Sequence, residues 1–352
     1  MADSRAPAAG GAGPPAASQD PAATGAPAAW RRAAAWAADR ESHGARRWVQ
    51  VALGVIWLLD AALQYQPYMF TRAFPTQVIE PAGAGSPGFV AHPVVFAGQL
   101  MLHNEVAFNA LFATIQLAIA VGLLWRPTIR AALTGSIIWG LLIWWLGEGL
   151  GGVLTSSASP ITGAPGGALL YALVAVLAWP PRSPAADGTS VAAGSPLGGR
   201  WARIAWLALW GSGAYFLLLA ANRAAGALRA TITGGGDGEP GWIAGAERGA
   251  GSLIGTHSSA VTIGLAVLFA IIAAGVFVPG ATRPALVLAV ITAAAIWLLG
   301  QSLGEIATGQ ATDPNTGPLL ILLSAAYWPL VRTRRRPRES PAMPAQEAAS
   351  RS

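Results

Sequence analysis

Two carboxylates interrupt apolar stretches of this chain, and both are candidates for binding a ligand or a proton. Asp60 stands in ALGVIWLLDAALQ, and Glu148 stands in WWLGEGLGG with a glycine on each side. A charge within a membrane span costs roughly 2.5–3.5 kcal/mol on insertion scales, so an acid at such a place is a candidate functional group. Gln64 follows Asp60 by four residues and therefore lies on the same face of a helix.

The segment LMLHNEVAFNALFATIQ adds a histidine at the expected outer start of the next apolar helix. Four side chains would then share the outer half of the membrane and form one ligand or proton site: Asp60, Gln64, His103 and Glu148. Gln116, deeper in the same segment, is expected to hydrogen-bond to a neighbouring helix. Ordinary roles compete with this hypothesis, namely an internal hydrogen bond for Asp60 and a solvated helix end for His103 and Glu148.

Eight apolar segments would position these side chains in a multi-pass membrane protein. The 352 residues are 53% hydrophobic and 11% charged, with a mean hydropathy of +0.48, whereas soluble domains carry about 25% charged residues. The fourth and eighth segments are shorter than the ~17–25 residues of a typical span, so re-entrant segments are an alternative for them. The segments cover residues 49–66, 106–125, 128–147, 165–180, 201–220, 259–279, 284–301 and 317–331.

The arginines predict how these segments are oriented. They cluster before the first segment, in alternate connections and after the last segment. If all eight segments span, every arginine-rich connection falls on one side, which is the positive-inside pattern. The protein is therefore expected in the plasma membrane, with both termini in the cytoplasm. Residues 67–103 and 222–257 are expected to be external loops. All 22 basic residues are arginine, which indicates a GC-rich bacterial genome.

An internal repeat divides the eight segments into two sets of four. RWVQVALGVIWLLDA at 47–61 aligns with RWARIAWLALWGSGA at 200–214, and PGFVA aligns with PGWIA at the same offset of 153 residues. Because four is an even number, both sets enter the membrane in the same direction, as a parallel repeat. The expected fold is all-α, with two four-helix bundles and eight transmembrane helices. Its parts are a disordered cytoplasmic tail (1–46), the first half (47–181), a cytoplasmic linker (182–199), the second half (200–332) and a basic, polar tail (333–352).

The two halves differ at their polar positions. Asp60 aligns with Gly213, and Glu148 aligns with Gln301. We therefore expect the first half to hold the chemistry and the second half to act as scaffold. Gln301 is a secondary candidate because its amide can still hydrogen-bond a ligand, and so is His257, which lies close to the position of the first half's histidine.

Absent residues and motifs narrow the range of cofactors. The chain has no cysteine, which excludes disulfides, thiolate nucleophiles and iron–sulfur clusters. It also lacks the P-loop, H-E-x-x-H and G-x-S-x-G motifs, and no metal site is expected. A haem between His103 and His257 is a weak alternative, since only the repeat pairs them. The isoelectric point near 10.6 reflects arginines beside apolar runs, which favours membrane topology over nucleic-acid binding.

The first half also has a characteristic order of elements. ALGVIWLLDAALQ is followed by a long connection and then by FNALFATIQLAIAVGLLWRPTIRAAL, with a polar residue in the helix, a glycine near its end and an arginine turn. This layout resembles the DoxX-like family of four-helix bacterial membrane proteins, here in tandem. The resemblance covers most of 47–181, and 200–332 more weakly. Members of that family are associated with membrane redox chemistry, including a thiosulfate:quinone oxidoreductase subunit and thiol-stress complexes.

Three classes of function follow from these observations. The resemblance implies a redox-associated or structural accessory subunit, for which a quinone would be a suitable ligand and a membrane or soluble oxidoreductase a suitable partner. The alternative is a proton-coupled small-molecule transporter that uses Asp60 and Glu148 as proton carriers. Parallel repeats favour transport, whereas the sequence gives no sign of paired interrupted helices at corresponding positions. The third class is an assembly factor without a ligand.

Overall fold

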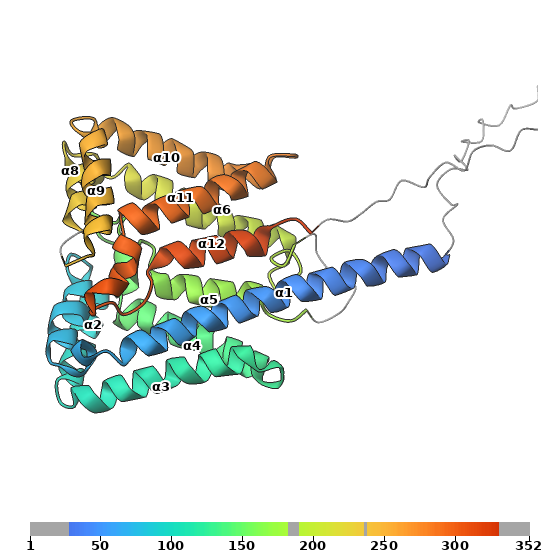
Figure 1. Ribbon diagram of the computed structural model, residues 1–352, viewed down its shortest axis with the longest axis horizontal. Coiled ribbons are helices and arrows are strands. Elements are labelled where there is room, and N and C mark those ends of the chain that lie inside the picture. Colours follow the sequence, from blue (N-terminus) through green and yellow to red (C-terminus); the bar gives the residue numbers. More distant parts are fainter. Residues whose placement is uncertain (1–27, 182–189, 236–237, 331–352) are drawn as a thin grey trace, which may run out of the picture. The chain divides into compact units, whose positions relative to one another are not determined.

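The computed structural model describes residues 28–181, 190–235 and 238–330, and its regular elements are helices (Figure 1). This confirms the all-α class. The chain divides after Ala38, so residues 28–38 are the helical part of a small unit and the rest belongs to one larger unit. Eight helices coincide with the eight expected apolar segments: α1 (Ala28–Gln64), α3 (Glu105–Leu124), α4 (Ile129–Leu146), α5 (Gly167–Leu177), α6 (Gly198–Leu217), α10 (Ser258–Gly275), α11 (Thr282–Leu299) and α12 (Thr316–Tyr327).

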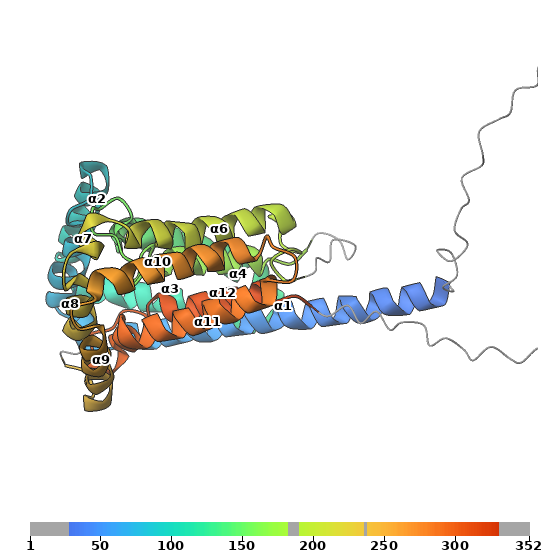
Figure 2. The same ribbon diagram turned by 90° about the horizontal axis from the view of Figure 1, so that it is seen from above.

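Short helices cross one end of the bundle, where two loops were expected (Figure 2). We call this end the cap; its helices are α2 (Gly88–Met101), α7 (Ala220–Arg223), α8 (Ala227–Gly234) and α9 (Gly241–Ile254). The helices α2 and α9 begin directly after Pro87 and Pro240, whose ψ angles of 152° and 140° are extended. The expectation of loops was wrong here because the repeated Pro-Gly motif starts a helix in both halves.

The two short segments, α5 and α12, lie at the centre of the larger unit (Figure 1). The helix α4 packs against α5, α11 packs against α12, and α5 packs against α12. Most residues of α5 and α12 are buried, and one continuous apolar core includes residues from both halves. A helix that is buried on all sides is apolar all round, which explains the uniform composition of both segments.

A segment with non-helical residues precedes each of the central helices α5 and α12. Each segment crosses the protein together with the helix that follows it. At ~1.5 Å per residue the 11 residues of α5 extend ~16 Å, about half of a ~30 Å bilayer core. The preceding segments begin with η6 (Gly149–Gly152) and η8 (Ser302–Thr308), which both contain left-handed residues. Irregular backbone is tolerated at membrane depth only inside protein or beside water. Ala158, Ile161 and Ala311 in these segments are indeed buried.

Aligned residues of these two segments make the same contacts. Trp144 Nε1 donates to the carbonyl of Pro165 at 2.7 Å, and Trp297 Nε1 donates to the carbonyl of Pro314 at 2.8 Å. In the first segment Gly151 has a φ of 62°, and a Cβ there would lie 2.0 Å from the Pro165 oxygen. Only glycine at this position therefore allows the turn to approach the backbone of Pro165 so closely.

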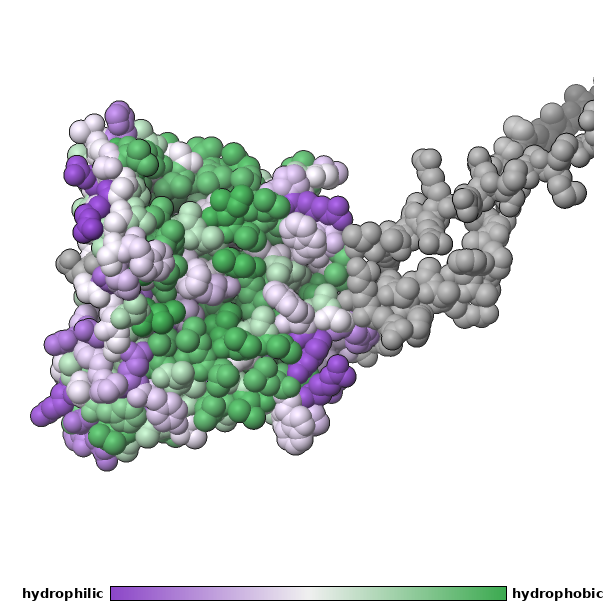
Figure 3. Space-filling model, viewed as in Figure 1, coloured by the Kyte–Doolittle hydropathy of each residue, from purple (hydrophilic) through white to green (hydrophobic). Residues whose placement is uncertain are grey.

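The surface of the larger unit is that of a membrane-embedded protein. Figure 3 shows an apolar band between two more hydrophilic ends. Soluble monomers rarely expose contiguous apolar patches larger than a few hundred Å². Four helical stretches are long and apolar enough to cross a membrane, namely Glu105–Leu124, Arg126–Leu146, Ser258–Gly275 and Thr282–Thr308. We conclude that the chain is embedded in a membrane.

Exposed aromatic side chains mark both edges of the apolar band. Trp48 on α1 and Tyr65 directly after it are 59% and 52% exposed, and their separation along the chain corresponds to ~25 Å at ~1.5 Å per residue. Tryptophan and tyrosine are enriched at the two membrane–water interfaces. Further exposed aromatics lie at the end far from the cap (Trp125, Trp201) and at the cap end (Trp145, Tyr215, Trp242).

Two arginines that were used to predict orientation also cap helices. Arg46 is buried, and its guanidinium donates to the carbonyls of Leu177 and Trp179 at 2.9 and 2.8 Å, at the carboxyl end of α5. Arg47 donates to the carbonyls of Leu123 and Leu124 at 2.8 and 2.6 Å, at the end of α3. A cation at a helix carboxyl end satisfies free carbonyls and the helix dipole.

The structure describes α1 from Ala28, within the part of the chain that was expected to be a disordered tail (1–46). Residues 1–27, 182–189 and 331–352 lie outside the described residues. The remaining part of the expected linker is described, and Val191 and Ser195 in it are buried against the bundle.

The predicted orientation can be tested at the two ends of α3. Single cysteines in this Cys-free chain, His103→Cys and Arg126→Cys, flank that helix, and both positions are exposed. We expect a membrane-impermeant thiol reagent to label the first variant in intact cells and the second only after permeabilisation. Labelling of both in intact cells would contradict a span at α3, and the reverse pattern would invert the topology.

Candidate functional site

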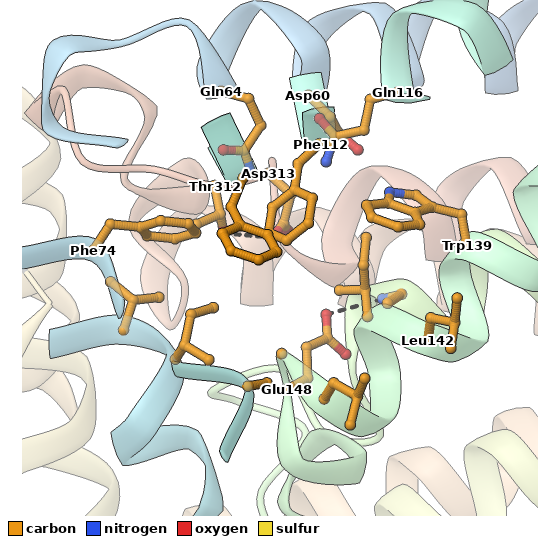
Figure 4. Close-up of a pocket in the computed structure, with 18 of the residues that line it drawn as sticks. Asp60, Gln64, Phe74, Phe112, Gln116, Trp139, Leu142, Glu148, Thr312 and Asp313 are labelled. Carbon is orange, nitrogen blue, oxygen red and sulfur yellow. Dashed lines mark hydrogen bonds between the residues drawn. The ribbon is translucent and has the colours of Figure 1, made fainter. Parts of the chain in front are cut away.

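A cavity of about 260 Å³ lies in the first half, beneath the cap (Figure 4). Its walls are mainly apolar and aromatic and come from α1, α2, α3, α4, α5 and the segment before α12. Small-molecule sites have this character, with a few polar groups placed on apolar walls. Its main lining residues are Trp57, Phe74, Leu100, Phe108, Phe112, Trp139, Leu142 and Tyr171, with the polar groups Asp60, Gln64, Gln116, Glu148, Thr312 and Asp313.

Several polar atoms in this cavity have no hydrogen-bond partner among the residues that the structure describes. A buried polar group without a partner costs about 1–3 kcal/mol, and native proteins contain few of them. Convergence of several on one apolar cavity therefore indicates that they serve a ligand. The atoms are Asp60 Oδ1, Gln64 Oε1, Gln116 Oε1, Trp139 Nε1, Glu148 Oε2 and the hydroxyl oxygen of Tyr171.

Asp60 lies on α1, with 2% of its side chain exposed. The hydroxyl of Tyr171 lies close enough to interact with its carboxylate, yet the two make no hydrogen bond of good geometry. The Tyr171 ring is held by Trp57, whose ring centroid lies 4.2 Å away, and Trp57 Nε1 donates to Ser136 at 2.9 Å. The packing thus fixes the groups around Asp60 while leaving its carboxylate available.

Glu148 faces Asp60 and Gln64 from the opposite side of the cavity (Figure 4). Its Oε1 accepts a hydrogen bond from the Ala168 N–H at 3.0 Å, in the first turn of α5. A Cβ at Gly166 would lie 2.2 Å from Oε2, so glycine is needed beside the carboxylate. Burial, and secondly the charge of Asp313, raise the pKa of Glu148 to about 8, although hydrogen bonds from the α5 backbone oppose the shift.

Asp313 is a member of the site that sequence analysis missed. It lies in the segment before α12, in the second half, but its side chain reaches the cavity of the first half. Its oxygens accept hydrogen bonds from Thr312 Oγ1 at 2.8 Å and from the Asn315 N–H at 2.7 Å, and burial raises its pKa. The signal in the sequence was an acid in TDPNTG, directly before an apolar segment. The site in the first half therefore includes a residue of the second half, whereas all its members were expected within one bundle.

The corresponding place in the second half is filled. Phe269 aligns with Gln116 at the offset of 153 residues, just as Gly213 aligns with Asp60. A Cβ at Gly213 would lie 2.6 Å from the ring of Phe269, and that ring packs on Trp210 with centroids 4.9 Å apart. The two substitutions belong together, because the phenylalanine occupies the space that the absent side chain would need.

Both the nitrogen and the oxygen of the Gln301 side-chain amide are hydrogen-bonded. Its Nε2 donates to Thr316 Oγ1 at 2.7 Å, and its Oε1 accepts from the Gly317 N–H at 3.2 Å, in the first turn of α12. It thus satisfies the start of α12 as Glu148 satisfies the start of α5. A neutral amide is enough for this structural role, so the acidity of Glu148 is not explained by packing.

The two histidine candidates lie apart from the cavity. His103 is exposed at the end of α2, where its Nδ1 bonds to the carbonyl of Gln99 at 3.0 Å. His257 is exposed at the start of α10. Neither lines the cavity. Among the described residues no group of three or more His, Cys, Asp or Glu side chains is arranged to hold a metal ion.

No protein-family model, curated protein or solved structure matches the chain. The DoxX-like resemblance therefore stays a prediction.

We expect Glu148→Gln to fold and to weaken the pH dependence of stability. In the wild type the pKa of this buried acid rises from 4.5 to about 8, so the folded state holds its proton more tightly than the unfolded state. The contribution of this proton to the free energy of unfolding is complete below about pH 4.5. It falls as the pH rises to about 8, by at most ~1.4 kcal/mol per pH unit. Thermal unfolding in detergent across this range measures it.

The matched control is Gln301→Glu, which places an acid at the aligned position of the second half. This variant should lose more stability with rising pH than the wild type does, because it buries one more carboxyl group. Equal pH slopes in wild type and Glu148→Gln would contradict the assignment of a raised pKa to Glu148.

Proposed function

We propose that this chain is an accessory subunit of a membrane redox system and binds a lipid-soluble ring compound of the quinone class. In this proposal it has two repeated four-helix halves, eight spans and both termini in the cytoplasm of a bacterial plasma membrane. The observation that carries the ligand proposal is the set of unpartnered polar atoms around an aromatic cavity. The DoxX-like resemblance supports the redox context and an oxidoreductase as partner.

The cavity suits a single planar ring with oxygen atoms. Its volume of about 260 Å³ is slightly smaller than the ~300–1,000 Å³ of typical small-molecule sites, which limits the ligand to one ring. Aromatic side chains line it, among them Phe112 and Trp139, whose ring centroids are 5.3 Å apart. Trp139 Nε1 is a free donor for a ring carbonyl, and the carboxyl groups of Asp60 and Glu148 donate when protonated.

The cavity also has a suitable opening for a ligand from the membrane. Leu100 on α2 and Leu142 on α4 line it, and both are 43% exposed. The cavity therefore reaches the surface where α2 meets α4, and both residues at the opening are apolar. A lipid-soluble ligand can enter there without crossing water, and its apolar tail can remain between these helices.

The proposal is tested by replacing two cavity residues of the first half with the aligned residues of the second half. The double variant Asp60→Gly/Gln116→Phe copies Gly213 and Phe269, so the new ring should fill the cavity. A short-chain quinone at ~100 times its Kd should raise wild-type stability by ~2.7 kcal/mol, which is read as a thermal shift. We expect the variant to bind at least tenfold more weakly, while its own melting temperature is unchanged or higher, since unpartnered polar atoms are removed.

Two controls separate binding from nonspecific effects. Thr262→Val changes a buried residue of α10 that does not line the cavity, and it should leave the quinone shift intact. Decanol, which has a chain but no ring, should give no shift with the wild type. A quinone shift that survives in the double variant would refute this site.

A proton-coupled transporter is the second candidate, and one observation favours it. The helices α5 and α12 both begin inside the protein, at corresponding positions, after non-helical segments. Paired interrupted helices of this kind form substrate and ion sites in transporters. The sequence showed no sign of such a pair, so the structure weakens that earlier objection.

Proteoliposomes distinguish transport from an accessory role. With a pH-sensitive dye trapped inside and a proton gradient imposed, a transporter that leaks or exchanges protons through Glu148 should dissipate the gradient faster than its Glu148→Gln variant. The proposed accessory role predicts equal rates for both.

A further inference from the structure

A second, polar hollow of about 390 Å³ adjoins the cavity on the far side of Glu148. It is lined by glycine backbone and by small polar residues of the segment before α5, including Ser159 and Thr162. Ala84 and Ser157 line it and are exposed, so it reaches the surface. Its composition is opposite to that of the aromatic cavity, and it suits water rather than an apolar ligand.

Glu148 and Asp313 line both spaces. A Cβ at Gly167 would lie 3.5 Å from Glu148 Oε1 and 3.4 Å from Asp313 Oδ1, so both carboxylates lie against the same glycine. One comes from the first half and the other from the second. They form the partition between an apolar space that opens beside the lipid-facing α4 and a polar space that opens near the cap.

From this geometry we propose that Glu148 and Asp313 form a proton relay, which takes protons from water in the polar hollow and presents them to the aromatic cavity. The relay deepens the proposed function, because a bound ring compound would exchange protons through it. Its uptake of a proton from the hollow needs no ligand. Glu148 is the member that faces the cavity, since its Oε2 has no partner, whereas both oxygens of Asp313 are hydrogen-bonded.

The proton balance of the relay is simple. A hydronium ion in the hollow loses a proton to a carboxylate of the pair, which leaves one water molecule and one carboxylic acid. Glu148 then releases its proton to an acceptor in the cavity, and the carboxylate is restored. The pair holds one proton more readily than none, because two adjacent buried carboxylates repel each other.

The surroundings favour one shared proton over two charges. The titratable groups that act on Glu148 are Asp313 from the segment before α12, Asp60 from α1 and Tyr171 from α5. None of these carries a positive charge. The backbone N–H of Ala168 supplies one hydrogen bond to the charged form, which keeps Glu148 ionisable. Gln301, at the aligned position, cannot take part in such an exchange.

Infrared spectroscopy of the whole protein tests the relay directly. Protonated carboxyl groups have a carbonyl band that shifts on deuteration, and Glu148→Gln identifies the part due to Glu148. We expect this band to titrate near pH 8 in the wild type. In Asp313→Asn its midpoint should move to lower pH, because the repelling charge is gone.

A matched pair of variants tests the path through the hollow. Ser157 lines the hollow, whereas its neighbour Ser156 is exposed and does not line it. Ser157→Phe should block the mouth and slow deuterium uptake at Glu148 at least tenfold, and Ser156→Phe should leave the rate unchanged.

The outcomes separate this proposal from the proposed function. An unchanged midpoint in Asp313→Asn, or equal uptake rates in the two serine variants, overturns the relay even where a quinone binds. Failure of quinone binding with both infrared results as expected refutes the ligand and leaves the relay standing. Asp313→Asn decides the question alone if Ser157→Phe does not fold.

Discussion

The amino-terminal ends of α5 and α12 lie inside the protein, where the first N–H groups of each helix need hydrogen-bond acceptors from the surrounding chain. Glu148 meets this need for α5 and Gln301 meets it for α12, each from a turn with left-handed residues that brings the side chain onto the helix start. Unsatisfied helix ends in an apolar interior cost several kcal/mol. The close glycine contacts and the buried non-helical segments follow from this requirement.

Within that shared frame, the halves differ in what they leave unsatisfied. The second half fills the space beside Gly213 with Phe269 and hydrogen-bonds Gln301, whereas the first half keeps Asp60 and Gln116 around a cavity with free polar atoms. Stability alone would favour the closed arrangement, because it avoids the desolvation of unpaired groups. The open arrangement is the basis for proposing a ligand, and the internal comparison shows which residues differ between the halves.

Hydropathy and the repeat predicted the helices well, since a buried or lipid-facing helix must be apolar over its length. Asp60, Gln64 and Glu148 could be predicted as one site because charge and amide groups are conspicuous in such helices. Asp313 could not, because it lies in a connection and reaches the site only through contacts between the halves. Gln116 was assigned a helix–helix bond, and only the cavity shows its oxygen unpartnered. The cap was missed because α2 and α9 have only 14 residues each and are interrupted, α2 by Pro93 and α9 by glycines.

The coupling of Phe269 with Gly213 bears on why the two halves share one chain. In a symmetric homodimer of a single half, every substitution occurs twice, so a change that fills one cavity fills both. Covalent fusion removes that restriction and lets one copy lose its cavity while the other keeps it. It also permits a residue such as Asp313, which lies across the boundary and has no acidic counterpart, to complete a single site. One chain can thus combine two halves of aligned sequence with a single proposed site.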